Sequence, residues 1–283
     1  MRKTIITLIL ILVAVYAVLS VLSLGDEYRA ESLFYRAMKA NEKIVINPDV
    51  APPKLCAAVE NNLRKILEGY PETTTAKSAH IALAEFYLYR KKYDKALSTL
   101  GEIIEAEGQD LRMLSKAHFY KGVVHEKQDE WDKALKEYTI LRDAYTDTGI
   151  GLQMPLYIGR YYAEKGEKPE AAEAYEEAAR YYEKLETENR GEMLGYAAST
   201  LLRQTYIILW KYEEAGRVVE ETIDNYPSEQ TYVQQLPSVE LIFVKALKRP
   251  EKAVEIYKKI IEKTKNERLI KQLQKRIGQL EAN

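Results

Sequence analysis

The chain of 283 residues carries 42 Lys and Arg side chains against 43 Asp and Glu, a formal net charge of -1. This balance gives no net attraction to nucleic acid, so we expect no nucleic-acid partner. The single cysteine, Cys56, excludes an intrachain disulfide.

The N-terminal part of the chain contains an apolar run from Ile5 to Leu24, 20 residues without a charge. At ~1.5 Å per residue, a helix of this length can span a bilayer. Arg2 and Lys3 precede the run, and positive charge on a short N-terminal side predicts that this side stays in the cytoplasm. We therefore predict that residues 1–25 form a transmembrane anchor or uncleaved signal and that the rest of the chain is extracytoplasmic.

A cleaved signal peptide is the alternative, because Ser23 and Gly25 form an acceptable cleavage site. The apolar region of such a peptide is usually shorter, roughly 7 to 15 residues, and the length here favours a retained anchor. In a bacterium the anchored chain would lie on the periplasmic side of the inner membrane. An organelle lumen and a tail facing the cytosol stay open as alternatives.

Residues 26–51 predict a first helix, from Tyr28 to Lys43, followed by a proline-containing loop. The loop is predicted because Pro48 and the pair Pro52-Pro53 forbid helical continuation. A second helix should follow the loop, so that the two form an irregular first hairpin. The apolar stripe of that second helix is Val59, Leu63 and Ile66.

Farther along the chain, a pattern recurs in which a helix-sized segment ends, turns, and gives way to a second helix that opens with an alanine. The spacing between successive alanines is 37 to 44 residues, which indicates a stack of helical hairpins. The five alanines are Ala96, Ala134, Ala171, Ala215 and Ala253.

The neighbours of each alanine fall at fixed offsets. Small residues let helices approach closely and large ones fill the space beside them. Twelve residues earlier stand Ala84, Gly122, Gly159, Arg203 and Leu241, and nine earlier stand Tyr87, His125, Tyr162, Tyr206 and Val244. Four and seven residues later, an apolar stripe is formed by Leu100, Ile103, Tyr138, Leu141, Tyr175, Ala178, Val219, Thr222, Tyr257 and Ile260.

The turns and helix ends fit the same hairpins. The sequence Lys-Lys-Tyr-Asp-Lys-Ala ends at Ala96, and Asp-Glu-Trp-Asp-Lys-Ala ends at Ala134. Asp94 and Asp132 are predicted helix caps, whereas Pro169 and Pro250 suit a first helical turn. The helix after Pro169 should extend to about Glu188, and the pairs Tyr70-Pro71 and Tyr226-Pro227 should end helices.

These alternating small and large positions resemble the tetratricopeptide repeat, a helix-turn-helix unit of roughly 34 residues. The resemblance covers about residues 52–264. It implies an all-α fold, a right-handed solenoid of about five to six hairpins, with Arg203, Thr222 and Leu241 as departures from the pattern. After it, residues 265–283 are predicted to form a capping helix with the apolar stripe Leu269, Ile270, Leu273, Ile277 and Leu280.

No catalytic constellation is found in the sequence, so we predict no enzyme activity, no cofactor and no metal. Each of the three histidines occupies a repeat position, which indicates packing. His118 and His125 would be ~10 Å apart along a helix, too far to share one ion without other ligands.

The resemblance also implies a binding groove lined by the first helices of successive hairpins. Its predicted residues are Glu85, Leu88, Tyr89, Lys116, Phe119, Val123, Glu126, Gln153, Arg160, Ala163, Thr200, Gln204, Ile207, Ser238, Ile242 and Lys245. We single out Glu85, Tyr89, Lys116, Phe119, Glu126, Arg160, Gln204 and Lys245 as candidate contacts for a protein or peptide. An ordinary solvated helix surface is the alternative.

The segment from Glu60 to Thr99 is similar to bacterial envelope members of the repeat family, some of which carry an N-terminal membrane anchor. This resemblance implies a membrane-tethered scaffold, without chemistry of its own, for envelope protein assembly or export. A soluble exported assembly factor or chaperone, released by signal cleavage, is the second hypothesis. The oligomeric state is not predicted.

Overall fold

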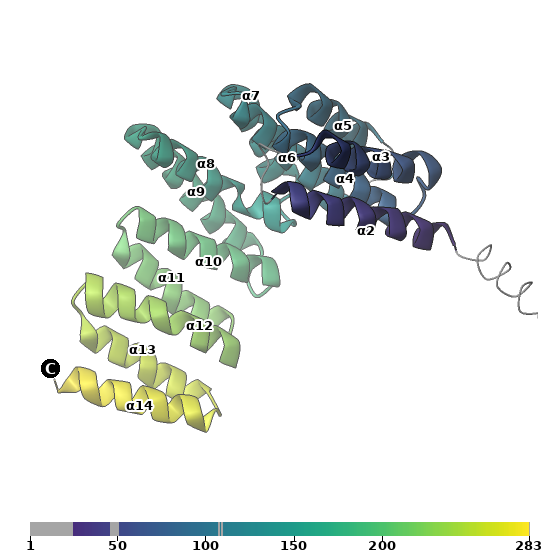
Figure 1. Ribbon diagram of the computed structural model, residues 1–283. Coiled ribbons are helices and arrows are strands. Elements are labelled where there is room, and N and C mark those ends of the chain that lie inside the picture. Colours follow the sequence, from purple (N-terminus) through teal and green to yellow (C-terminus); the bar gives the residue numbers. More distant parts are fainter. Residues whose placement is uncertain (1–24, 46–50, 107, 109, 283) are drawn as a thin grey trace, which may run out of the picture. The chain divides into compact units, whose positions relative to one another are not determined.

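The computed structural model describes residues 25–45, 51–106, 108 and 110–282. Within these residues all regular structure is helical, with thirteen α-helices and one π-helical segment (Figure 1). The chain divides into two compact units, the first ending at Leu141 and the second beginning at Arg142, inside one helix. The predicted anchor at Ile5–Leu24 lies outside the described residues, and none of the described helices has the length and apolar character that a membrane crossing requires.

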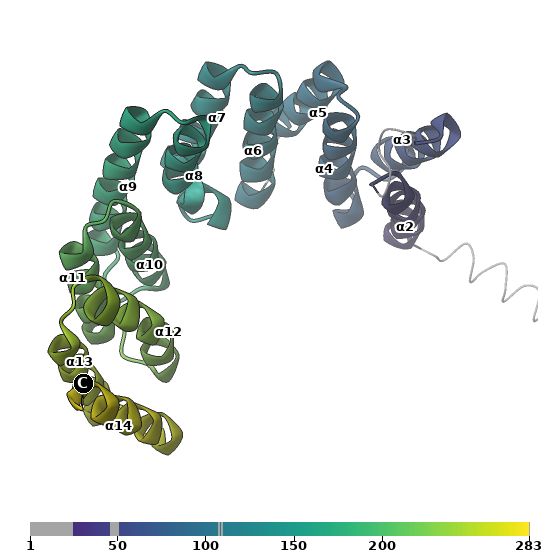
Figure 2. The same cartoon turned by 60° about the vertical axis from the view of Figure 1, so that its left-hand side comes forward.

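Unit 1 is a stack of antiparallel helical hairpins. Figure 2 shows α2, α4 and α6 on one side of the unit and α3 and α5 on the other. The first helix and the helix after the proline pair are confirmed, and the stripe residues Val59, Leu63 and Ile66 are fully buried. The helices are α2 (Asp26–Val45), α3 (Pro53–Gly69), α4 (Thr74–Tyr89), α5 (Tyr93–Glu105), α6 (Leu111–Lys127) and α7 (Trp131–Ala144).

Unit 2 continues the same alternation, with α8, α10, α12 and α14 on one side and α9, α11 and α13 on the other (Figure 2). The long helix that was predicted to reach Glu188 is confirmed as α9. The capping helix is confirmed as α14, which buries Leu269, Leu273 and Ile277. The elements are α8 (Gly149–Lys165), α9 (Lys168–Glu188), α10 (Met193–Ile208), α11 (Tyr212–Asn225), α12 (Glu229–Val239), η2 (Glu240–Ala246), α13 (Pro250–Lys263) and α14 (Glu267–Glu281).

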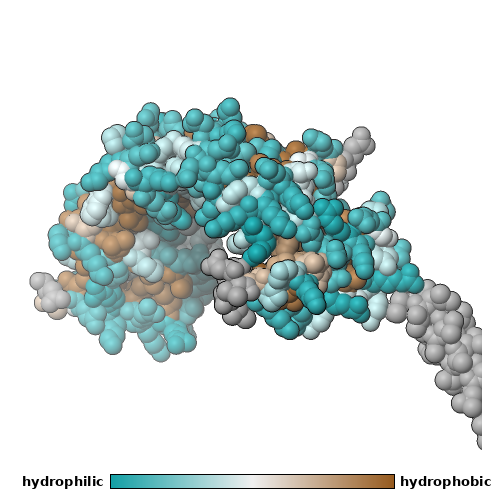
Figure 3. Space-filling model, turned by 45° about the horizontal axis from the view of Figure 1, so that its top comes forward, coloured by the Kyte–Doolittle hydropathy of each residue, from teal (hydrophilic) through white to brown (hydrophobic). Residues whose placement is uncertain are grey.

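The repeated alanines and the stripe that follows them form the core. All five alanines and all ten predicted stripe residues are buried, none of them more than 9% exposed. Figure 3 shows that hydrophilic side chains cover most of the face in view of the described chain, with smaller hydrophobic areas between them. Within each unit, burial of this stripe holds successive hairpins together, since no single hairpin can cover its own apolar face.

Two glycines allow close approach of a tyrosine from the second helix of the same hairpin. A Cβ atom on Gly122 would lie 2.3 Å from Cε1 of Tyr138, and one on Gly159 would lie 2.6 Å from Cδ1 of Tyr175. At the equivalent position Arg203 is large, and the matching residue of the second helix is the smaller Val219. At Arg203 a large residue of the first helix therefore faces a smaller residue of the second, the reverse of the arrangement at Gly122 and Gly159.

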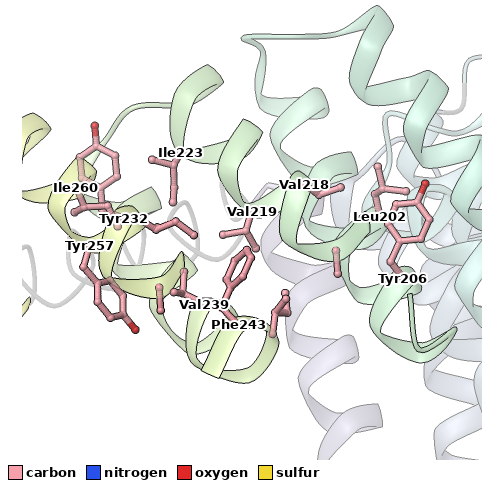
Figure 4. Packing of buried hydrophobic residues seen from close by; sticks show 14 of the residues in the cluster. Leu202, Tyr206, Val218, Val219, Ile223, Tyr232, Val239, Phe243, Tyr257 and Ile260 are labelled. Carbon is pink, nitrogen blue, oxygen red and sulfur yellow. The ribbon is translucent and has the colours of Figure 1, made fainter. Parts of the chain in front are cut away.

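The last hairpin differs from the prediction because its first helix contains the π-helical segment η2. Leu241, predicted at a packing position, is 39% exposed, whereas Phe243 lies between Val219 and Val239 in the core (Figure 4). A π turn adds one residue to the helical turn, so an offset counted back from Ala253 falls on the wrong face. Phe243 also covers Gly216, where a Cβ atom would lie 2.7 Å from Cζ of the ring.

The predicted caps at Asp94 and Asp132 are wrong. Both residues lie inside the first turn of their helix, and the N-cap of α5 is Lys92, whose side chain makes no cap hydrogen bond. A carboxylate in the first turn still faces the positive end of the helix dipole. Side-chain caps stand instead in the turns between hairpins, where Thr73, Asp110, Thr148, Ser228 and Asn266 accept from backbone N–H groups.

The turn within each hairpin uses a left-handed residue five positions before the alanine. The φ angles are 55° at Lys91, 58° at Asp129, 80° at Gly166, 60° at Trp210 and 57° at Lys248. Only one of these is glycine, the residue that adopts this conformation without steric cost. The hairpins therefore share a turn geometry that the residue types at this position do not predict.

Candidate protein-interaction site

The best candidate for a binding site is an open hollow of about 410 Å³ in unit 1, between α2, α4 and α6. We call it the α2/α4/α6 hollow. Its apolar lining consists of Phe34 and Met38 from α2, Ile81 and Ala82 from α4, and Met113 from α6. Three first helices thus contribute to one surface, as the resemblance predicts for a groove.

The hollow depends on where α2 lies. Ala30, Ala37 and Ile44 repeat at seven-residue spacing on α2 and are 0%, 0% and 3% exposed. This stripe packs on α3 and α4 and turns Phe34 and Met38, one helical turn apart, toward the hollow.

Glu27 fixes the N-terminal end of α2 against the N-terminus of α4. Its carboxylate accepts hydrogen bonds from the backbone N–H groups of Thr74 and Thr75, both at 2.9 Å, and from their hydroxyls at 2.7 and 2.6 Å. The hydroxyl bonds from Thr75 and Thr74, followed by the backbone bonds, lower the pKa of Glu27 to about 2. The carboxylate therefore caps a helix 47 residues away in the chain.

The acidic side chains around the hollow already have hydrogen-bond partners within unit 1. Asp110 is occupied as the N-cap of α6, accepting from the backbone N–H of Met113 at 2.7 Å. Glu85 accepts a hydrogen bond from Tyr120, and burial together with this bond raises the pKa of that tyrosine.

Lys77, Arg112 and Lys116 also line the hollow. Among the described residues, none of these three cations forms an ion pair. The hollow therefore offers an apolar lining with available positive charge around it, which suits an apolar side chain flanked by a carboxylate.

Two of the predicted groove residues, Glu85 and Lys116, line this hollow. Tyr89 is 67% exposed at the end of α4. Phe119 is half-buried beside the ring of Tyr120, with ring centroids 5.5 Å apart. Glu126 accepts a hydrogen bond from the Tyr138 hydroxyl.

The remaining candidates, in unit 2, are exposed: Arg160, Gln204 and Lys245. Two other residues predicted to face the groove are buried, Leu88 at 8% and Ile242 at 0% exposed. Leu88 belongs to the core cluster of unit 1, and the π segment turns Ile242 inward. Phe34 and Met38 were missed, although their i, i+4 spacing in the expected first helix was a usable signal.

Each histidine pairs with a glutamate. The closest pair joins Nδ1 of His118 to Oε2 of Glu137 at 2.7 Å, between α6 and α7. Burial opposes ionisation of Glu137, but hydrogen bonds from His118 and Lys121 outweigh it and lower the pKa of this carboxyl. His125 bonds Glu130 at 2.9 Å, and the described residues contain no cluster of three or more side chains suited to a metal ion.

No family model and no curated protein matches this chain. Among solved structures, one similar chain is a tetratricopeptide repeat protein from Parabacteroides merdae, with 15% identity, a TM-score of 0.36, and coverage of 87% of this chain and 99% of that one. BtubC (BKLC) from P. vanneervenii has 14% identity, a TM-score of 0.38 and coverage of 92% and 93%. The P58(IPK) TPR domain has 14% identity, a TM-score of 0.30 and coverage of 89% and 65%. TM-scores this low do not establish a shared fold or function.

The class of protein follows from the chain's own geometry. The described residues form an all-α helical repeat, in which buried alanines and apolar stripes recur at fixed offsets along the hairpins of each unit. Its hairpins resemble the tetratricopeptide repeat in that a small residue of the first helix faces a large residue of the second, as at Gly122 and Tyr138.

Proposed function

We propose that this protein is a membrane-tethered, extracytoplasmic scaffold that binds other proteins and serves in envelope protein assembly or export. The observation that carries the proposal is the α2/α4/α6 hollow, with its apolar lining and with basic side chains that form no ion pair with any described residue. Such a surface holds a segment of another chain through an apolar anchor and a carboxylate, and it requires no reaction chemistry.

The tether is proposed from the uncharged run Ile5–Leu24 with Arg2 and Lys3 before it. A tethered binder meets membrane partners at a raised effective concentration, so weak contacts in an open hollow suffice. The second candidate is a soluble assembly factor released by cleavage near Gly25, and the acceptable cleavage site at Ser23 and Gly25 favours it. N-terminal sequencing of the mature protein separates the two, since a start near Asp26 supports release.

The binding proposal is tested by photocrosslinking of the full chain in its native membrane. A photoreactive residue replaces Ser78, which lines the hollow, or Lys65, which is exposed on α3. We expect discrete adducts from position 78, identified by mass spectrometry, and few from position 65. Equal adduct patterns at the two positions would contradict a binding role for the hollow.

Charge reversal provides the matched variant pair. Arg112→Glu with Lys116→Glu should abolish most position-78 adducts, because both cations border the hollow. Lys65→Glu with Lys136→Glu makes the same change in net charge on exposed second-helix positions and should leave the adducts intact. Loss of adducts in both double variants would show a nonspecific charge effect and would refute the site.

A further inference from the structure

Helix α2 presents an aromatic line that faces away from the rest of unit 1. Figure 1 shows α2 at the edge of the unit, and its packing partners are α3 and α4. Tyr28 is 57% and Tyr35 is 64% exposed, although both are large aromatic side chains. Seven residues are close to two helical turns, so the two rings lie on one line along the outer side of the helix.

A basic line runs beside the tyrosines. Arg29, Arg36 and Lys43 follow one another at seven-residue spacing, and all three are exposed. Arg36 and Lys43 form no ion pair with any described residue. Lys39 lies over the Tyr35 ring, with its Nζ 5.8 Å from the ring centroid.

The acidic residues of α2 contact α4, form ion pairs or flank the aromatic line. Glu27 is held by α4, and Asp26 forms an ion pair with Arg29 at 3.7 Å. By helical spacing, Glu31 and Glu42 flank the aromatic line on the side opposite to the basic line, and Glu42 forms an ion pair with Lys39 at 3.4 Å. We call Tyr28, Arg29, Tyr35, Arg36, Lys39 and Lys43 the outer face of α2. It combines two tyrosines with four cations.

The rotation of α2 about its own axis is fixed. Ala30, Ala37 and Ile44 are buried on the opposite side, and the carboxylate of Glu27 is bonded to four donors at the start of α4. The outer face cannot turn into the core without breaking these contacts. It is therefore a permanent surface of unit 1, open to a partner outside the unit.

The position of α2 in the chain indicates which partner the outer face contacts. Only Gly25 separates the start of the helix from the apolar run that ends at Leu24. A Cβ atom at Gly25 would meet nothing within 4 Å, and glycine adopts backbone conformations that other residues avoid, so the chain can change direction there. A helix that directly follows a membrane span lies at the level of the lipid headgroups, where tyrosine rings and basic side chains are favoured.

We propose that the outer face of α2 lies along the surface of an anionic bilayer, with Tyr28 and Tyr35 at the headgroup level and the basic line against lipid phosphates. This inference rests on the proposed tether but is independent of any partner in the α2/α4/α6 hollow. It gives unit 1 a defined orientation on the membrane instead of leaving it on a flexible stem.

The test uses the full chain in lipid nanodiscs. With Cys56→Ser as background, the variant Tyr35→Cys carries an environment-sensitive fluorophore on its cysteine, and spin-labelled lipids act as quenchers. The matched control is Tyr89→Cys, because Tyr89 is also a tyrosine and is 67% exposed, but lies on α4. We expect quenching at position 35 to exceed that at position 89 by about twofold or more in discs of phosphatidylcholine with phosphatidylglycerol.

Arg36→Glu with Lys43→Glu should reduce quenching at position 35 toward the level of position 89. Equal quenching at both positions in an inserted chain would overturn the inference and leave the tether standing. Resistance to alkaline carbonate extraction reports insertion separately, and an extracted chain would overturn both. A label at position 35 that self-quenches with a second copy, without lipid quenching, would assign the face to self-association and would also overturn the inference.

Discussion

The packing of Tyr138 on Gly122 supports a quantitative prediction. Gly122→Ala places a carbon 2.3 Å from Cε1 of Tyr138, whereas unstrained carbon contacts are about 3.5–4.0 Å long. Tyr138 is fully buried and its hydroxyl is bonded to Glu126, so the ring cannot move aside freely. Overpacking of this kind costs about 1–3 kcal/mol of unfolding free energy.

The control for helix propensity is Gly101→Ala in α5, where the new carbon meets nothing within 4 Å. Alanine is favoured over glycine inside a helix by about 1 kcal/mol, so this control should be stabilised. We expect the unfolding free energies of the two variants to differ by about 1–3 kcal/mol, measured by urea unfolding of the full chain in detergent with far-UV circular dichroism.

A second substitution tests whether contact with the Tyr138 ring causes the loss of stability. Tyr138→Leu in the Gly122→Ala background recreates the pair Ala84 and Leu100 of an earlier hairpin, so the double variant should lose less stability than the two single changes predict together. Equal midpoints for Gly122→Ala and Gly101→Ala, or strictly additive effects of the two changes at 122 and 138, would refute the close-packing account.

Three further predictions concern a helix cap, an ion pair and a turn. The pKa of Glu27 falls from 4.5 to about 2 on folding, so its contribution to stability is present above pH 4.5 and disappears as the pH falls toward 2. Between these pH values the unfolding free energy should therefore fall less in Glu27→Gln than in the parent, and an equal fall would contradict the assignment. Arg276 bonds both carboxylate oxygens of Glu240 at 2.7 and 2.8 Å and lowers its pKa. Glu240→Gln should lower the unfolding free energy by about 0.5–1 kcal/mol, and the exposed Glu255→Gln should lower it by less. Equal losses in the two variants would argue against a stabilising ion pair between Glu240 and Arg276. Lys91 has a φ of 55°, so Lys91→Ile should destabilise by about 1 kcal/mol while Lys91→Gly should not, and identical thermal midpoints would contradict this.

The regular hairpins could be predicted from the sequence because one physical requirement repeats. Each second helix must bury its alanine and the residues four and seven positions later, and all of these positions are buried. The degenerate first hairpin was also predictable, since Pro53 marks the start of α3. Periodicity and proline chemistry are local properties, which a sequence carries in full.

Other features depend on contacts that the sequence does not encode locally. The π segment after Pro237 shifts the offsets of the last hairpin, and counting back from Ala253 cannot detect the shift. Lys91 and Trp210 adopt a conformation usually given to glycine, because the hairpin turn imposes it. The hollow depends on the packing of α2 beside α4, and the hydrogen bonds of Glu27 with the start of α4 join residues 47 positions apart in the sequence.

The contact between Glu27 and the start of α4 also sets an order of events during synthesis. A ribosome delivers the chain from its N-terminus, so α2 emerges before the partners that hold it. Its first turn gains its four hydrogen bonds only once Thr75 is available, 48 residues later. Until then, the stretch next to the apolar run lacks these hydrogen bonds, so protection of this stretch from an added protease should report that α4 has joined α2.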